Sequence, residues 1–180
     1  MRFTLLDRIT QLEPGVRIEA VKNLSLAEEY LADHFPLFPV MPGVLMLEAM
    51  TQAGAWLIRA GEDFAHSMVV LSEAKNVKYA DFVKPGQTLT VSAEILSQDE
   101  HETRLKAQGF IAGVPTVSAR LVLRRYNRAT THPVYAVSDE ATRLGMRRLF
   151  AILYPSYQPD ATSATEMATS SHLANGGVIT

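Results

Sequence analysis

The chain has 180 residues, of which 47% are hydrophobic and 20% are charged, and its seventeen basic and nineteen acidic side chains leave a net charge of −2. This composition suits one globular domain with a sizeable core, and it excludes a wholly disordered or collagen-like chain and a disulfide or thiolate-metal protein, because cysteine is absent. There is no basic excess and no hydrophobic leader, and the most apolar stretch, 44–58, is short and interrupted by polar residues, so we expect a cytoplasmic protein with no membrane span and no nucleic acid partner.

The first third of the chain is predicted to hold two strands, a short helix and a stiff loop. Extended segments at 3–12 and 16–24 flank a turn, and Ser25 is placed to cap a helix over 26–32. The loop that follows, from His34 to Gly43, contains three prolines, which exclude helical geometry there and hold the loop stiff.

A long helix is predicted from 42 to about 60, with Gly61 placed to end it. Its apolar residues cover almost every face, which indicates a buried helix. The strand-like runs after it, joined by short turns, are 67–74, 88–96, 103–111 and 115–126. Consecutive strands with short turns favour an antiparallel sheet. We therefore predict an α+β domain with an antiparallel sheet around one central helix.

The C-terminal part differs in character. Ser138 is predicted to open an amphipathic helix that runs to about 153 and has an apolar face formed by Met146, Leu149, Phe150 and Leu153. Its basic residues, Arg143, Arg147 and Arg148, are candidates to contact an acidic protein, and packing of the helix on the core is the alternative. From 155 the chain is rich in Ser, Thr, Ala and Gly and is expected to be disordered. The expected division is therefore 1–126 as the main domain, 127–154 as an extension and 155–180 as a tail.

Three features between residues 34 and 52 are candidates for chemistry. Glu48 is an ionisable group in an apolar helix, where it either has a catalytic use or reaches a partner or water, and Gln52 lies one turn later on the same face. His34 stands at the start of the stiff loop that leads to this helix. The first helical N–H groups, those of Gly43 and Val44, lack acceptors within the helix and suit a ligand oxygen. Together these groups suit proton abstraction next to a carbonyl.

The other histidines show no metal-ligand spacing with one another or with carboxylates, so no metal site is predicted. These residues are His66, His101, His132 and His172.

The stretch from His34 to Gln52, HFPLFPVMPGVLMLEAMTQ, resembles the signature HFPGxPVMPGVLxxEAxAQ of the 3-hydroxyacyl-(acyl-carrier-protein) dehydratases of the FabZ and FabA type. The spacing between His34 and Glu48 matches, and so does VKPGQTL at 83–89, where the family has V-x-P-G-D-x-L. The resemblance covers roughly residues 3–126.

This resemblance implies a hotdog fold and a homodimer or trimer of dimers, with active sites between subunits. It implies that His34, oriented by the backbone carbonyl of Val40, removes the α-proton of a 3-hydroxyacyl thioester carried by acyl carrier protein. Glu48, held by Gln52, would protonate the departing hydroxyl, and the Gly43 N–H would bind the thioester oxygen. The histidine would come from one protomer and the glutamate from the other, with no metal and no cofactor. Glutamate at position 48 resembles the branch that only dehydrates.

The loop also departs from the signature, because Leu37 replaces a glycine and Phe38 is a further change beside the site. These departures keep two alternatives open. One is a hotdog acyl thioesterase in which Glu48 activates water, and the other is a non-catalytic acyl-binding module. The acyl chain length and the pathway, whether fatty acid, lipid A or polyketide synthesis, are left open by the sequence.

Overall fold

The computed structural model describes residues 4–156, and six antiparallel strands around a central helix form the body of the fold. The elements in chain order are β1 (Arg8–Glu13), β2 (Arg17–Asn23), α1 (Tyr30–Asp33), α2 (Gly43–Gly61), β3 (Met68–Tyr79), β4 (Thr88–Gln98), β5 (Glu102–Ile111), β6 (Val114–Tyr126), the 3-10 turns η1 (Arg128–Thr130) and η2 (Pro133–Tyr135), and α3 (Ala136–Leu153). The strands form one sheet in the order β1-β2-β4-β5-β6-β3, and every neighbouring pair is antiparallel.

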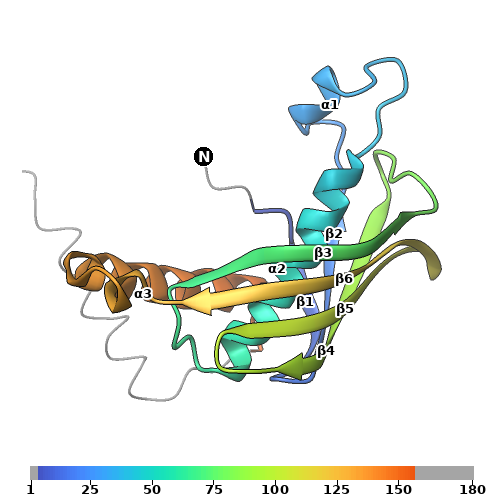
Figure 1. Cartoon of the computed structure of the whole chain (residues 1–180). Coiled ribbons are helices and arrows are strands. Elements are labelled where there is room, and N and C mark those ends of the chain that lie inside the picture. Colours follow the sequence, from blue (N-terminus) through green and yellow to red (C-terminus); the bar gives the residue numbers. More distant parts are fainter. Residues whose placement is uncertain (1–3, 157–180) are drawn as a thin grey trace, which may run out of the picture.

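The sheet curves around α2, which contacts five of its strands, β2 to β6 (Figure 1). The core that forms between them includes Met50 and Leu57 of α2 and Leu105 and Leu121 of the sheet, each at most 1% exposed. Burial of such side chains on both surfaces is what holds a helix against a sheet. This arrangement confirms the α+β class and the hotdog fold.

Two of the early elements are shorter than the sequence predicts. β1 begins at Arg8 rather than at residue 3, because the chain before it turns toward α2, where the backbone N–H of Leu5 donates to Gln52 Oε1 over 3.0 Å. The predicted helix over 26–32 is the single turn of α1. Ser25 Oγ accepts a hydrogen bond from the N–H of Ala27 at 3.1 Å, which closes a local turn in place of a helix cap.

β3 ends at Tyr79, five residues beyond the end predicted from the sequence, residue 74. The strand continues through a register irregularity between Lys75 and Lys78, where Asn76 has a φ of 51°, and it ends at Tyr79 opposite Val117 of β6. The polar run at 75–78 hides the strand in the sequence, because the pairing with β6, and not an apolar alternation, maintains it.

α3 begins at Ala136, two residues before the predicted start, and Ser138 does not cap it. The residue that fixes this end of the helix is the buried Asp139. Its carboxylate accepts hydrogen bonds from Ser67 Oγ at 2.8 Å, from Arg128 Nε at 3.0 Å and from the N–H of Ala129 at 2.8 Å. Burial raises the pKa of Asp139, but these donors outweigh it and leave the pKa below its usual value.

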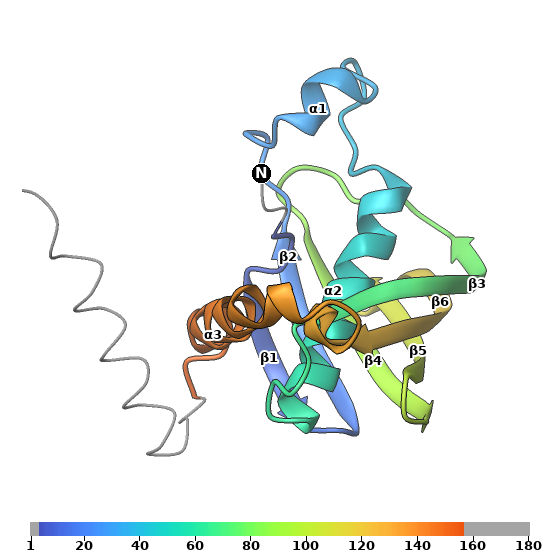
Figure 2. The same ribbon diagram turned by 60° about the vertical axis from the view of Figure 1, so that its left-hand side comes forward.

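The apolar face of α3 closes the core at the C-terminal end of α2. Phe150 is fully buried, and its ring centroid lies 5.4 Å from that of Phe64 and 5.8 Å from that of Trp56. Arg147 binds Asp63, with Nη1 2.6 Å from Oδ1, so packing accounts for this basic residue. Figure 2 shows α3 lying against the body of the domain, well apart from α1 and its loop. The predicted tail lies almost wholly outside the described residues, and within them no helix is long and apolar enough to cross a membrane.

Candidate functional site

His34 is held at the C-terminal end of α1 with its ring half-buried. Its backbone N–H donates to the carbonyl of Tyr30 at 3.1 Å, and its Nδ1 lies 3.2 Å from the carbonyl oxygen of Val40, which is fully buried. When Nδ1 carries the proton and donates to this carbonyl, Nε2 keeps a free lone pair. In that tautomer Nε2 is the ring nitrogen able to accept a proton.

The loop between His34 and α2 adopts its turn without a glycine at position 37. Its left-handed residue is Phe35, with a φ of 51°, and Leu37 is not among the residues with positive φ. The N–H of Met41 donates to the carbonyl of Val83 at 2.9 Å, which ties the loop to the second matching segment, 83–89. The replacement of glycine by Leu37 therefore does not prevent the loop from forming its turn and its hydrogen bond to Val83. The side chain of Leu37 is fully exposed.

Glu48 and Gln52 are paired on one face of α2. Gln52 Nε2 donates to Glu48 Oε1 at 2.9 Å, while Gln52 Oε1 accepts the hydrogen bond from the N–H of Leu5. Because a backbone N–H can bond only the oxygen of the amide, this contact turns the amide nitrogen toward the carboxyl group. The second carboxyl oxygen of Glu48 remains available to a ligand.

The N-terminus of α2 presents backbone donors beside Gly43. The N–H groups of Leu45 and Met46 donate to the carbonyl of Pro42 at 2.9 and 3.2 Å, whereas those of Gly43 and Val44 precede the helical hydrogen bonds. α2 begins at Gly43, one residue after the predicted start, so Pro42 is the N-cap and not the first helical residue.

Tyr79 is a residue of this region that the sequence does not reveal. A Cβ on Gly43 would lie 3.0 Å from Tyr79 Cε1, so the ring packs directly against the glycine. Burial raises the pKa of the Tyr79 hydroxyl. The predicted strand ends before Tyr79, so only the observed extension of β3 brings this ring to the start of α2.

A cavity of about 500 Å³ adjoins Glu48. Its lining comes from α2, β3, α3 and the N-terminal segment, and it comprises Thr4, Glu48, Thr51, Gln52, Ala55, Trp56, Arg59, Val69, Val70, Leu71, Thr142, Met146 and Leu149. His34, Val40 and Gly43 do not line it. The structure of one chain thus holds His34 and Glu48 in separate places.

The sequence does not predict the contribution of α3 to this cavity, because it depends on packing between segments about 90 residues apart. Arg59, in contrast, could be placed beside Glu48 from the sequence. The spacing of residues 48, 52, 55 and 59 puts them on one face of a helix.

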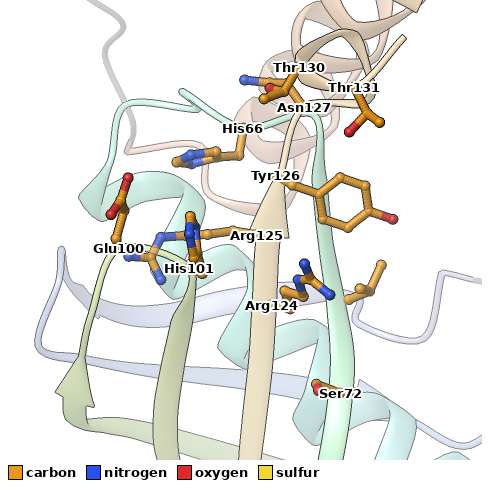
Figure 3. Close-up of a pocket in the computed structure, with 11 residues that line it drawn as sticks. His66, Ser72, Glu100, His101, Arg124, Arg125, Tyr126, Asn127, Thr130 and Thr131 are labelled. Atoms are coloured by element: carbon orange, nitrogen blue, oxygen red, sulfur yellow. The ribbon is translucent and has the colours of Figure 1, made fainter.

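A larger open cavity of about 680 Å³ lies near the C-terminal end of α2 (Figure 3). Several of its charged groups already serve the fold. His66 Nδ1 is 2.9 Å from Glu62 Oε2, and Arg125 Nε is 2.6 Å from Glu62 Oε1, with Arg125 Nη1 also donating to Thr103. His66 and Arg125 are therefore occupied by one carboxylate, and this cavity is the weaker candidate for acid–base chemistry. Between residues 4 and 156 no group of three His, Asp or Glu side chains is placed to hold a metal ion.

Comparison with known proteins identifies the family to which this chain is related. The model of the FabA-like domain matches residues 1–117. The 3-hydroxyacyl-(acyl-carrier-protein) dehydratase FabZ of Geobacillus thermodenitrificans is 37% identical over 141 residues, which cover 77% of this chain and 87% of that protein. FabZ of Ruminiclostridium cellulolyticum is 38% identical over 111 residues, covering 62% of this chain and 78% of that protein.

Solved structures share the fold at low sequence identity. The dehydratase heterocomplex ApeI:P from Xenorhabdus doucetiae aligns with a TM-score of 0.58 and 19% identity, over 74% of this chain and 90% of that chain. The structure of smu.793 from Streptococcus mutans bound to acetyl CoA aligns with a TM-score of 0.56 and 11% identity, over 71% of this chain and 94% of that chain.

Proposed function

Because the chain belongs to the FabA-like family, we propose that it dehydrates 3-hydroxyacyl thioesters carried on acyl carrier protein to trans-2-enoyl thioesters. The observation that carries the proposal is the way each acid–base group is held. His34 Nδ1 contacts the carbonyl oxygen of Val40, which leaves Nε2 free to act. Glu48 Oε1 accepts a hydrogen bond from the amide of Gln52, which leaves Oε2 free to act. A positioned pair of this kind is what removal of a proton and loss of a hydroxyl require.

In the proposed reaction His34 Nε2 accepts the proton from the carbon next to the thioester carbonyl. Glu48 donates its proton to the 3-hydroxyl, the C–O bond breaks, water leaves and the carbon–carbon double bond forms. The backbone N–H groups of Gly43 and Val44 stabilise the thioester oxygen as negative charge develops on it. Transfer of a proton from His34 to Glu48 then restores the starting protonation state of both side chains.

The site is proposed to form between two copies of the chain. His34 does not line the cavity beside Glu48, so a second protomer supplies the histidine in the proposed complex. Two features of the protomer support this. β3 is at the end of the sheet, paired only with β6 in the described residues. The loop and helix start around His34 also expose large apolar side chains, namely Phe35, Leu37, Phe38 and Val44.

A single assay separates the proposed activity from its alternatives. The purified protein is mixed with a 3-hydroxyacyl thioester, and enoyl absorbance and free thiol are followed together. The proposal expects an enoyl signal without thiol. Thiol release alone would identify a thioesterase, and silence with both short chains and chains on carrier protein would favour a binding module.

Mixed protomers test the shared site. His34→Ala and Glu48→Ala are each expected to lower turnover about 10²- to 10⁴-fold while the protein stays folded. Refolding the two variants together at equal amounts is expected to restore about one quarter of the wild-type activity, because half of the dimers are mixed and each mixed dimer has one intact site. If both residues acted within one protomer, the mixture would stay inactive.

A further inference from the structure

The cavity beside Glu48 runs along one face of α2 and ends at a cation. Glu48 and Arg59 are eleven residues apart, which corresponds to about 16 Å of helix. The surface between them is mainly apolar, with Ala55 and Trp56 on α2 and Met146 and Leu149 on α3. This mainly apolar cavity has the proposed acid at one end and a guanidinium at the other. Its length and chemistry suit an acyl chain that carries a thioester at one end and a polar group at the other.

The Arg59 side chain lacks a charge partner among residues 4–156. Its Nε is buried without a hydrogen-bond acceptor, and its Cζ lies 5.5 Å from the centroid of the Trp56 ring. Burial lowers the pKa of Arg59 to about 10. Arg125, which is buried near the same end of α2, has the carboxylate of Glu62 at 2.6 Å. An uncompensated, partly buried cation costs free energy, so packing alone does not account for Arg59.

We propose that Arg59 binds a carboxylate at the far end of the acyl chain, so that the preferred substrates are 3-hydroxyacyl thioesters whose chain ends in a carboxylate rather than a methyl group. The inference rests on the proposed function, because it requires the thioester end of the substrate to lie at Glu48. A guanidinium donates two parallel hydrogen bonds to a carboxylate, and the shielded position strengthens them. The apolar walls from α2 and α3 contact the methylene groups between the two ends.

The test compares two series of 3-hydroxyacyl thioesters of matched chain lengths, one ending in a methyl group and one in a carboxylate. With the full-length wild-type protein, kcat/KM is expected to favour the carboxylate series by about tenfold or more at the length that reaches Arg59. Arg59→Met is expected to lower kcat/KM for that substrate about ten- to a hundredfold and to leave the methyl series unchanged or improved. Arg120→Met removes an exposed arginine on β6 and serves as the matched control, with both series unaffected.

The two proposals fail in different ways. Turnover of the methyl series with no preference for the carboxylate at any length, or the same preference in Arg59→Met, would overturn the inference and leave the dehydratase intact. Saturated acyl thioesters with the same two ends cannot be dehydrated, and their binding gives the comparison without turnover. Equal affinity for both ends would overturn the inference even if the activity were a different one. Because Arg59→Met removes an unpaired charge, we expect its unfolding midpoint to be unchanged or raised, and Arg59→Lys, which keeps the charge, provides a second variant.

Discussion

The two ends of α2 differ in whether the apolar side chains around them are buried. At its C-terminal end the chain covers its own apolar surface, because Phe150 packs against both Trp56 and Phe64, and each of the three is at most 5% exposed. At its N-terminal end Leu37 is fully exposed and Val44 is 69% exposed. The same helix thus has one end completed by its own chain and one end left open. The open end is where His34 and Gly43 lie, so the exposed apolar residues there belong to the proposed assembly of the site and not to the folding of the protomer.

The largest change is expected at the closed end. Phe150→Ala removes a fully buried ring that contacts both Trp56 and Phe64, and the free energy of unfolding should fall by about 3–5 kcal/mol. Denaturant unfolding measures this loss. Val137→Ala, at an exposed position on the same helix, is the control and should change the free energy by less than about 0.5 kcal/mol. A small loss in Phe150→Ala would mean that α3 does not complete the core.

A smaller effect, on activity, is expected at the open end. Gly43→Ala places a methyl group 3.0 Å from the Tyr79 ring, so the ring or the helix start must shift. We expect turnover of a 3-hydroxyacyl thioester to fall about ten- to a hundredfold, because the backbone donors are displaced from the thioester oxygen. Adding Tyr79→Leu removes the ring and should recover much of the loss. Full activity in the single variant would show that the position of this helix start is not critical.

The smallest effect on the fold is expected at Leu37. Leu37→Ser should change the free energy of unfolding of the protomer by less than about 0.5 kcal/mol, because the side chain contacts water in the single chain. If a second copy covers it, association between copies should weaken about tenfold or more, which a dilution series in sedimentation velocity measures. Ile152→Ser, at an exposed position near the closed end, should leave association unchanged. Equal association in the two variants would contradict the contrast between the ends.

The sequence predicts this fold well where a local pattern decides the structure. The apolar residues on all faces of 44–58 identify the central helix, and the helical period places Glu48 and Gln52 together. It predicts poorly where a distant segment decides. β3 extends to Tyr79 because β6 pairs with it. The α3 wall of the cavity has the same cause, since no short-range pattern brings Met146 to Glu48. The helix over 26–32 is an exception of local origin, because Ser25 Oγ bonds the N–H of Ala27 in a turn that the sequence pattern does not distinguish from a helix cap.

The position of β3 in the sheet has a consequence for synthesis of the chain. In the described residues β3 pairs only with β6, the last strand, although β4 and β5 are made between them. At about 5–20 residues per second, the 47 residues from Tyr79 to Tyr126 take roughly 2–10 s to be added. Throughout that time β3 is an unpaired strand joined to a long apolar helix that has no completed sheet around it. During this interval the nascent chain carries an unpaired strand and an uncovered apolar helix, the features that favour aggregation, and completion of β6 gives β3 its partner.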